Sequence, residues 1–229
     1  MAWRRLVLES SERVRRPEGQ HVGGKMNRSV LHEQDNRGDP GIRRALAAII
    51  ERIAREVPDI PDPIKMYLAG GVAVNFYTGE RSTRDVDASF SRRLILPPGN
   101  ELVVPYEGPD GQVRSLYLDT NYNTTFAVMH EDAEEDSWVV EGDQFDNRKI
   151  ELRVLAPVDL AVSKLARFAD NDREDIAALA RRRLIAVEAV DGRATEALKY
   201  YVGRIAGVQL NLRDALVIIH DAWQEAPRG

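Results

Sequence analysis

Residues 64–90 read IKMYLAGGVAVNFYTGERSTRDVDASF, and this stretch is the most informative part of the sequence about the fold. The apolar run 64–69 predicts a short buried strand, which the pair Gly70 and Gly71 ends. A short helix is expected over 72–77. Residues 84–90 then alternate between polar and apolar side chains, which predicts a second strand. The stretch therefore reads as strand, glycine turn, helix and strand.

Two features of this stretch point to phosphate and metal chemistry. Gly70 and Gly71 have no Cβ atoms, so a bound group can approach the backbone at the start of a helix whose N–H groups are unpaired. Asp85 and Asp87 are two residues apart on a strand, so their carboxylates lie on one face within about 7 Å. Carboxylates so placed can bind divalent cations such as Mg²⁺. Alone, a glycine pair is a common turn and two aspartates are a solvated strand face, so only the combination is informative.

This combination resembles the DNA-polymerase-β-like nucleotidyltransferase fold. The resemblance consists of the glycine pair, a spacer of 13 residues and the Asp-Val-Asp sequence that begins at Asp85. Residues 81–87, RSTRDVD, are similar to the abortive-infection, type IV toxin branch of that superfamily. A second block, DLAVSKLARF at 159–168 followed by DREDI at 172–176, resembles the helical segment of the same branch. In all, the resemblance covers about residues 64–185.

The resemblance implies a role for each matching residue at the metal centre. Asp85 and Asp87 would bind two Mg²⁺ ions. The superfamily often supplies a third carboxylate from an adjacent strand, and Glu151, in the strand expected over 150–154, is the candidate. Lys149 and Arg153 share the side of that strand on which Glu151 lies.

The resemblance likewise implies how the nucleotide would bind. Gly70 and Gly71, with Ser82 or Arg81, would face the triphosphate. Lys164 would contact phosphate or stabilise the leaving pyrophosphate, although a lysine on a helix is more often a surface residue.

Asp175 follows Lys164 by 11 residues, which is three helical turns plus roughly 20°. A continuous helix would put both on one face, whereas Asn171 and Asp172 could interrupt it. We expect a structural role for Asp175, as a cap or as a partner of Arg167 or Arg173.

The function expected from these residues is a Mg²⁺-dependent nucleotidyltransferase that moves a nucleoside monophosphate from a nucleoside triphosphate (NTP) to an acceptor hydroxyl. The toxin branch implies a tRNA 3′ end as acceptor and a cognate antitoxin as partner. A protein hydroxyl is the alternative acceptor. A second class also fits the residues, namely a non-catalytic nucleotide-binding module with a regulatory or antitoxin-like role.

The rest of the chain predicts an α+β protein, with a nucleotidyltransferase-like mixed β-sheet flanked by helices and a C-terminal helical bundle. Residues 1–38 are polar and arginine-rich and are expected to form a flexible arm, in which Met26 is an alternative start. Residues 39–156 would form the nucleotidyltransferase-like domain and 157–229 the helical domain. The expected elements are a helix over 40–57, strands near 102–104, 113–118, 124–129, 138–140 and 150–154, and helices from Pro157 to Trp223.

Composition excludes several other classes of protein. The 229 residues include no cysteine, so disulfide scaffolds, thiolate metal sites and cysteine nucleophiles are ruled out. No apolar run approaches the roughly 20 residues of a membrane helix, which favours a cytoplasmic protein without membrane contact. The net charge is -5, yet residues 119–147 contain nine Asp or Glu and no Lys or Arg. Removing that -9 leaves +4 on the remaining residues, which allows a local basic surface for tRNA.

Overall fold

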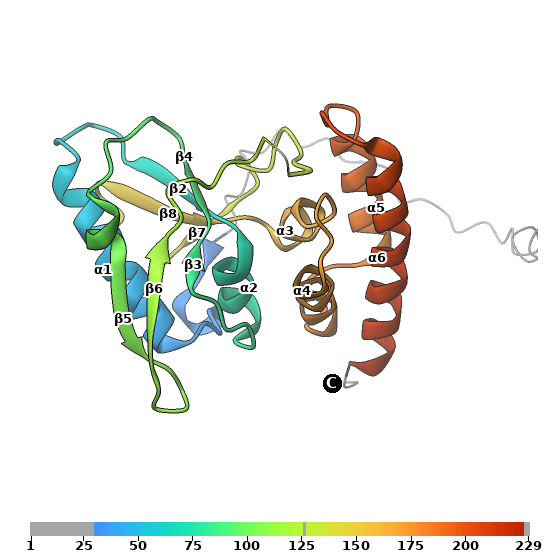
Figure 1. Cartoon of the computed structure of the whole chain (residues 1–229), viewed down its shortest axis with the longest axis horizontal. Helices are drawn as coiled ribbons and strands as arrows, with labels where there is room; N and C mark the ends of the chain where they lie inside the picture. Colours follow the sequence, from blue (N-terminus) through green and yellow to red (C-terminus); the bar gives the residue numbers. More distant parts are fainter. Residues whose placement is uncertain (1–29, 126, 227–229) are drawn as a thin grey trace, which may run out of the picture.

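The computed structural model describes residues 30–125 and 127–226, and Figure 1 shows its α+β architecture. The helices are α1 (Pro40–Glu56), α2 (Gly70–Thr78), α3 (Pro157–Ser163), α4 (Asp170–Arg181), α5 (Val187–Ala197) and α6 (Ile205–Glu225), with short 3-10 helices η1 (Glu33–Asp35) and η2 (Gly99–Leu102). The strands are β1 (Val30–Leu31), β2 (Ile64–Leu68), β3 (Asp85–Val86), β4 (Ala88–Phe90), β5 (Val103–Glu107), β6 (Val113–Leu118), β7 (Trp138–Val140) and β8 (Ile150–Val154). These mixed sheets flanked by helices confirm the expected fold class.

The first described residues belong to the sheet rather than to the predicted arm. Residues 1–29 lie outside the described part of the chain. Residues 30–38, expected in the arm, contribute β1, which pairs in parallel with β7. The Asp39 amide beyond them donates to Asn75 Oδ1 at 2.9 Å. Backbone pairing and hydrogen bonds therefore connect residues 30–39 to the rest of the fold.

Helix α1 confirms the helix expected over 40–57. Asp39 caps it by accepting from the amides of Gly41 (2.6 Å) and Ile42 (3.1 Å), and Pro40 occupies the first turn. Its buried face carries Leu46, Ile49 and Ile53 among others and packs on β5 and β6.

The central five-stranded sheet has the order β1-β7-β8-β2-β4. Strands β2 and β8 are parallel neighbours with Leu68 opposite Val154, so both end at the same edge of the sheet. The glycine turn and α2 follow β2 directly at that edge, and α3 follows β8. The connections thus bring α2 and α3 into contact.

The strand expected over 84–90 is divided between two sheets. Strand β3 pairs in parallel with β6 in a three-stranded sheet of order β3-β6-β5, whereas β4 pairs antiparallel with β2. Asp87 lies between the two pairings. The expected alternation holds nevertheless, because Val86 and Ala88 are buried while Asp85 and Asp87 are partly exposed.

The strand expected over 124–129 is absent from the described residues of that segment, so this prediction was wrong. Local hydrogen bonds explain the difference: Asp119 Oδ1 accepts from the Asn121 amide, and Asn123 Oδ1 accepts from the Thr125 amide. Such side-chain turns compete with strand pairing. The acidic loop 130–136 consequently follows an irregular segment rather than a strand.

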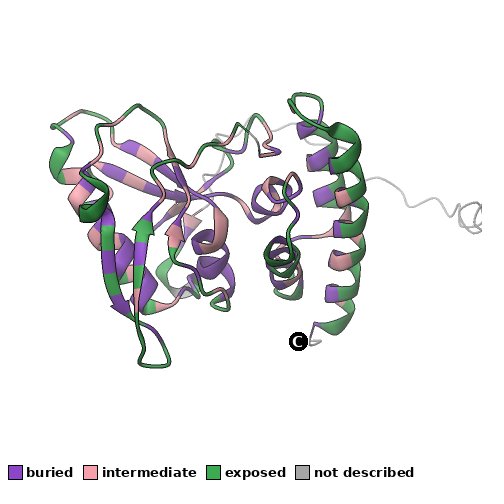
Figure 2. Ribbon diagram, in the orientation of Figure 1, coloured by how far each residue is buried: buried purple, intermediate pink, exposed green. Residues whose placement is uncertain are grey.

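Helices α3 to α6 pack together beside the strands, with α4 against α6 and α3 against α5, and α2 joins them to the rest of the molecule (Figure 1). Figure 2 shows that their buried surfaces face inward and that the outer side of α6 is largely exposed. The exact domain boundary at 156–157 stays a prediction. No helix in the part of the chain that the structure describes is long and apolar enough to cross a membrane.

Candidate active site

The structure brings most of the predicted site residues into one cleft. This cleft has a volume of about 690 Å³ and lies between the glycine turn, the carboxyl ends of β3 and β6, and the helices α3 and α4. The predicted residues that line it are Gly70, Gly71, Arg81, Asp85, Asp87 and Lys164. Residues from both blocks of the sequence resemblance therefore face the same space.

The glycine turn packs directly against Asp87, one of the two aspartates. Gly70 has φ of +60°, which is the left-handed region. A Cβ atom there would lie 1.9 Å from Asp87 Oδ2, and one at Gly71 would lie 2.9 Å from Thr83 Oγ1. The Ala69 amide also donates to the Asp87 carbonyl oxygen at 2.8 Å. Only glycine fits at residue 70, because the Asp87 carboxylate occupies the space of a side chain.

Asp85, Asp87 and Asp119 supply three carboxylates to the cleft. Thr83 Oγ1 donates to Asp85 Oδ1 at 2.8 Å. The parallel pairing of β3 with β6 continues beyond the strands, since the Asp119 amide donates to the Val86 carbonyl oxygen at 3.0 Å. Asp119 is thereby placed beside Asp87, a juxtaposition that the sequence analysis missed. An acidic residue directly after the strand expected over 113–118 was the available signal.

The electrostatic environment of Asp87 disfavours its negative charge. Burial raises the pKa of Asp87 to about 6, with further contributions from the charges of Asp85 and Asp119, while Lys164 and Arg167 act in the opposite direction. Burial, followed by the charge of Asp87, raises the pKa of Tyr122 to about 12. The carboxylates of the cleft are thus close enough to repel one another.

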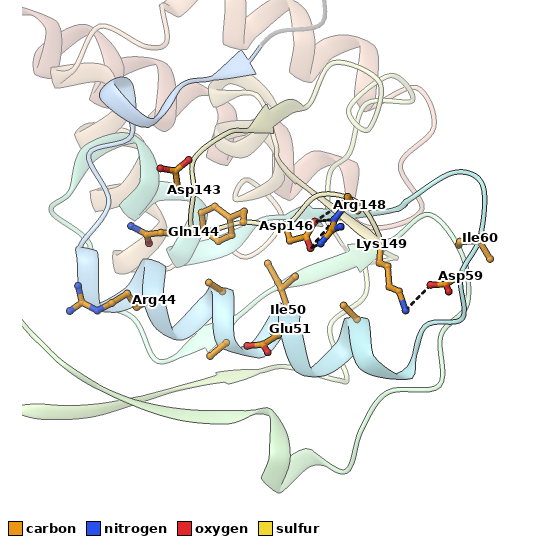
Figure 3. A pocket seen from close by; sticks show the side chains of 14 residues that line it. Arg44, Ile50, Glu51, Asp59, Ile60, Asp143, Gln144, Asp146, Arg148 and Lys149 are labelled. Atoms are coloured by element: carbon orange, nitrogen blue, oxygen red, sulfur yellow. Dashed lines mark hydrogen bonds and ion pairs between the residues drawn. The ribbon is translucent and has the colours of Figure 1, made fainter.

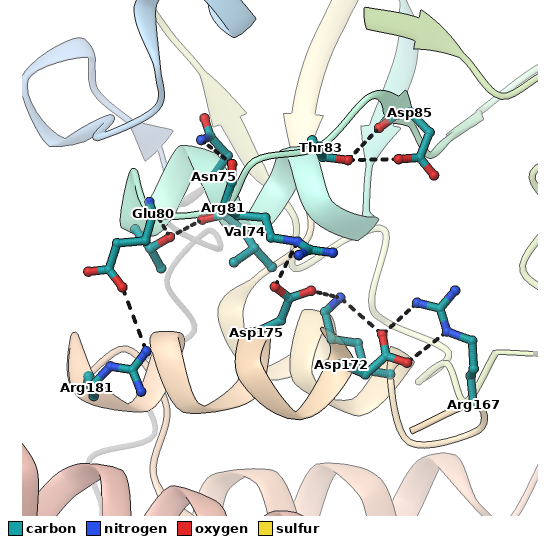
Figure 4. Close-up of polar contacts among 12 residues, drawn as sticks. Val74, Asn75, Glu80, Arg81, Thr83, Asp85, Arg167, Asp172, Asp175 and Arg181 are labelled. Atoms are coloured by element: carbon teal, nitrogen blue, oxygen red, sulfur yellow. Dashed lines mark hydrogen bonds and ion pairs between the residues drawn. The ribbon is translucent and has the colours of Figure 1, made fainter. Parts of the chain in front are cut away.

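The opposite wall of the cleft is an ion-pair network centred on two buried aspartates of α4 (Figure 4). Lys164 Nζ, itself buried, lies 2.7 Å from Asp175 Oδ2 and 3.6 Å from Asp172 Oδ1. Asp172 accepts two hydrogen bonds of 2.8 Å from Arg167. Arg81 Nε lies 3.2 Å from Asp175 Oδ1 without the alignment of a hydrogen bond. Three cations from two separate segments, the connection before β3 and that between α3 and α4, therefore converge on one helix.

This network revises the expectations for Lys164 and Asp175. The chain leaves the helical path between α3 and α4, where Phe168 has φ of +49°, so no continuous helix connects the two residues. They nevertheless meet because α3 and α4 pack against each other. Asp175 forms ion pairs with Lys164 and Arg81 rather than with Arg167 or Arg173, and its structural role stays a prediction.

Two predicted site residues lie away from the cleft. Ser82 is exposed, and its neighbour Thr83 lines the cleft instead. Glu151 is not part of the lining. The β2–β8 register pairs it with Lys65, near the start of β2 and far from the glycine turn, and its carboxylate bonds to Arg153 Nη1 at 2.8 Å. Asp119 provides the third carboxylate because strand pairing, which is not local in sequence, decides which acid reaches the cleft.

The donor set of the cleft fits a divalent cation in charge and in ligand type. Five aspartates and three cationic side chains line it, so its own charge is negative. Carboxylate oxygens are the ligands that Mg²⁺ prefers, and a cation would offset both the burial and the neighbouring charges of Asp85 and Asp119 that raise the pKa of Asp87. Within residues 30–125 and 127–226, however, no three His, Asp or Glu side chains already converge as a metal site. Binding of a metal would therefore require small side-chain adjustments or ligands from a bound nucleotide.

A larger cavity of about 810 Å³ lies elsewhere, between α1 and residues 143–149 (Figure 3). Its lining includes two ion pairs: Arg148 bonds to Asp146, and Lys149 lies 3.1 Å from Asp59. None of the predicted site residues lines it. The chemistry expected from the sequence therefore belongs to the smaller cleft.

A glycine turn faces paired strand carboxylates within mixed sheets flanked by helices, an arrangement consistent with a nucleotidyltransferase-like fold. A family model described as a nucleotidyltransferase of unknown function (DUF6036) matches residues 44–213, and the chain belongs to this family. No curated protein and no solved structure matched the chain. The family match supports the nucleotidyltransferase superfamily, whereas the toxin branch stays a prediction.

Proposed function

We propose that the protein is a Mg²⁺-dependent nucleotidyltransferase that transfers a nucleoside monophosphate from an NTP to an acceptor hydroxyl. In this reaction the acceptor oxygen forms a bond to the α-phosphorus, and the bond from that phosphorus to the bridging oxygen breaks. Pyrophosphate leaves with the electron pair, and the hydroxyl proton passes to solvent. Positioning and charge neutralisation supply most of the catalysis in such a transfer.

One observation supports this proposal most directly: the Gly70 turn closes on Asp87 in the same cleft that contains Asp85 and the buried Lys164. Asp85 and Asp87 would bind the two Mg²⁺ ions, with Asp119 as the third carboxylate. The ions, when bound, would neutralise charge on the phosphates. The glycine backbone would receive the triphosphate at the start of α2.

Lys164 and Arg81 would bind the phosphate chain on the opposite wall. Both cations form ion pairs with Asp175, which holds their side chains in position before a ligand binds. The Arg81 side chain lines the cleft and is about 25% exposed, and its Nε makes no hydrogen bond with any residue that the structure describes, so the guanidinium has N–H groups to offer a phosphate oxygen.

For the acceptor we favour a tRNA 3′ end, and for the setting a cytoplasmic toxin with a cognate antitoxin, as the resemblance to the toxin branch implies. The charge distribution is compatible with this choice, because one segment carries most of the acidic excess. A protein hydroxyl is the alternative acceptor.

A second candidate function is a non-catalytic nucleotide-binding module. The specific observation in its favour is that no three-ligand metal group is preformed among the described residues. In such a module the glycine turn and the cations would bind a nucleotide without transfer.

The two functions are separated by incubating the protein with each labelled NTP, Mg²⁺ and total tRNA or total protein. We expect transfer of label by the wild type and a loss of about a hundredfold or more in D85A/D87A, since the metal ligands are removed. The control variant D191A/D214A removes two exposed carboxylates from α5 and α6 and should retain transfer. NTP binding by the wild type, with no transfer to any acceptor, would favour the non-catalytic module.

A further inference from the structure

A second, smaller cavity adjoins the cleft on the side of β4 and β6. It has a volume of about 330 Å³, and we call it the β4 groove. Asp119, Tyr122 and Asn123 line both the cleft and the β4 groove. The groove therefore borders the cleft at these three residues and extends from them along β4.

Two arginines at the β4 groove have no carboxylate partner among the residues that the structure describes. Arg92 and Arg93 follow β4, both are exposed, and neither makes an ion pair or hydrogen bond with any residue that the structure describes. The only acidic residue in the lining is Asp119, at the end shared with the cleft. This differs from the cleft wall, where Arg81, Lys164 and Arg167 all pair with aspartates.

The remaining polar lining of the β4 groove is uncharged. It consists of hydroxyl and amide side chains from Ser89, Thr120, Tyr122, Asn123, Thr124 and Thr125. Such groups, together with arginine, make most protein contacts to the phosphates and sugars of nucleic acids. Unpaired guanidinium groups also match the geometry of phosphate oxygens.

The direction of the β4 groove matches the geometry of the proposed reaction. In phosphoryl transfer the attacking oxygen and the leaving group are roughly in line on opposite sides of the phosphorus. Two of the proposed triphosphate contacts, Lys164 and Arg81, pair with Asp175 on the α4 wall of the cleft, whereas the groove borders the cleft on the β4–β6 side. An acceptor in the groove would thus approach from the side away from the leaving pyrophosphate.

We propose that the β4 groove is the acceptor subsite and binds the phosphodiester backbone of a single-stranded nucleic acid through Arg92 and Arg93. This inference rests on the proposed function for the acceptor role alone. The binding itself needs neither metal nor NTP, because the two arginines lie outside the carboxylate cleft.

The test measures the binding of fluorescent 12-nucleotide single strands, one RNA and one DNA of the same sequence, by anisotropy at several salt concentrations without Mg²⁺ or NTP. Relative to the wild type, we expect R92A/R93A to bind the RNA, the DNA or both about tenfold or more weakly at 0.1 M salt. The slope of log K against log salt should fall by about 1.4, since two phosphate contacts are lost. The control variant R44A/R213A removes two exposed arginines from α1 and α6 and should match the wild type.

The inference is overturned if R92A/R93A binds both strands with the affinity and salt slope of the wild type, or if the wild type binds neither strand. If the wild type transfers label to a polypeptide, and R92A/R93A does so with the same KM for that polypeptide, the acceptor is a protein. That result would also overturn the inference. NTP binding, measured in parallel, should be equal in all three proteins. If the wild type binds the nucleic acid strands through Arg92 and Arg93 but transfers no nucleotide, the result would support the nucleic-acid site in the β4 groove and contradict the proposed function.

Discussion

At residue 70 the backbone φ of +60° and the nearby Asp87 carboxylate impose the same requirement, the absence of a side chain. A methyl group at this position would force Asp87 to move, and Asp87 is the proposed metal ligand beside the phosphate turn. The residue therefore links the stability of the turn to the chemistry of the cleft.

We expect G70A to lower the free energy of unfolding by about 1–3 kcal/mol and to abolish transfer, because the new Cβ strains the backbone and displaces Asp87. The matched control is G192A, in the interior of α5, where a Cβ would meet nothing within 4 Å. That variant should instead gain about 0.5–1 kcal/mol, since alanine favours helix over glycine. Urea denaturation measures both; equal stability of G70A and the wild type would contradict the clash.

Asp87 should make stability depend on pH. Its pKa is raised to about 6, so the folded state favours the neutral carboxyl, and its contribution to stability is present below about 3.8 and lost as pH rises through 6. In metal-free buffer with EDTA, D87N should therefore be more stable than the wild type at pH 8, by about 1–2 kcal/mol, with little difference near pH 4. Denaturation of both proteins at the two pH values is the measurement, and a difference independent of pH would refute the assignment.

The helices and strands around the cleft are short, and the way they pack on one another, rather than their length, determines where the cleft residues lie. Strands β3 and β4 have two and three residues, yet they connect the two sheets, with Asp85 in β3 and Asp87 between β3 and β4. On the other wall, α3 ends at Ser163 and α4 begins at Asp170, and the pairing of Lys164 with Asp175 spans this break. Lys164 and Asp175 are thus brought together by contacts between separate elements, and not by the continuous helix that their spacing in the sequence allowed.

We expect D175A to destabilise the protein by about 3 kcal/mol, because it leaves Lys164 buried without its closest partner. K164M should also destabilise, whereas K164M/D175L should lose less than the sum of the two single changes, since no unpaired charge remains between them. A double-mutant cycle of unfolding free energies gives the coupling. Additive effects would show that the two side chains do not interact.

At the scale of the whole molecule, the cleft exists only because the strand-rich part and the helical part are fixed together. Arg193 on α5 contributes to this fixation by bonding Asp159 on α3 at 2.7 Å and Asp136 of the acidic loop at 2.7 Å. His130 Nε2 of the same loop lies 3.2 Å from Glu196 on α5. The acidic loop, whose seven residues include five carboxylates, thus connects the two parts of the molecule.

A ligand that contacts both walls should stabilise the entire fold. NTP with Mg²⁺ at 100 times its dissociation constant should add about 2.7 kcal/mol to the unfolding free energy and raise Tm. D85N/D87N should lose most of the Mg²⁺-dependent part of this shift, whereas D191N/D214N should retain it. Thermal denaturation followed by circular dichroism measures the effect, and an equal shift in both variants would place the ligand outside the cleft.

The sequence by itself determined the features that depend on neighbouring residues. The capped helix α1, the buried strands β2 and β8, the glycine turn after residue 69 and the aspartate pair at 85 and 87 all follow from periodicity and local backbone chemistry. The resemblance to nucleotidyltransferases rests on the same local pattern, and the family match supports it at the level of the superfamily.

Only the tertiary structure decided which distant residues share the cleft. The β3–β6 pairing brings in Asp119, whereas the β2–β8 register holds Glu151 away from the glycine turn. The packing of α3 on α4 joins Lys164 to Asp175, and Thr83 rather than Ser82 faces the glycines. Strand register and helix packing are set by the burial of side chains far apart in the chain, and no local pattern in the sequence contains that information.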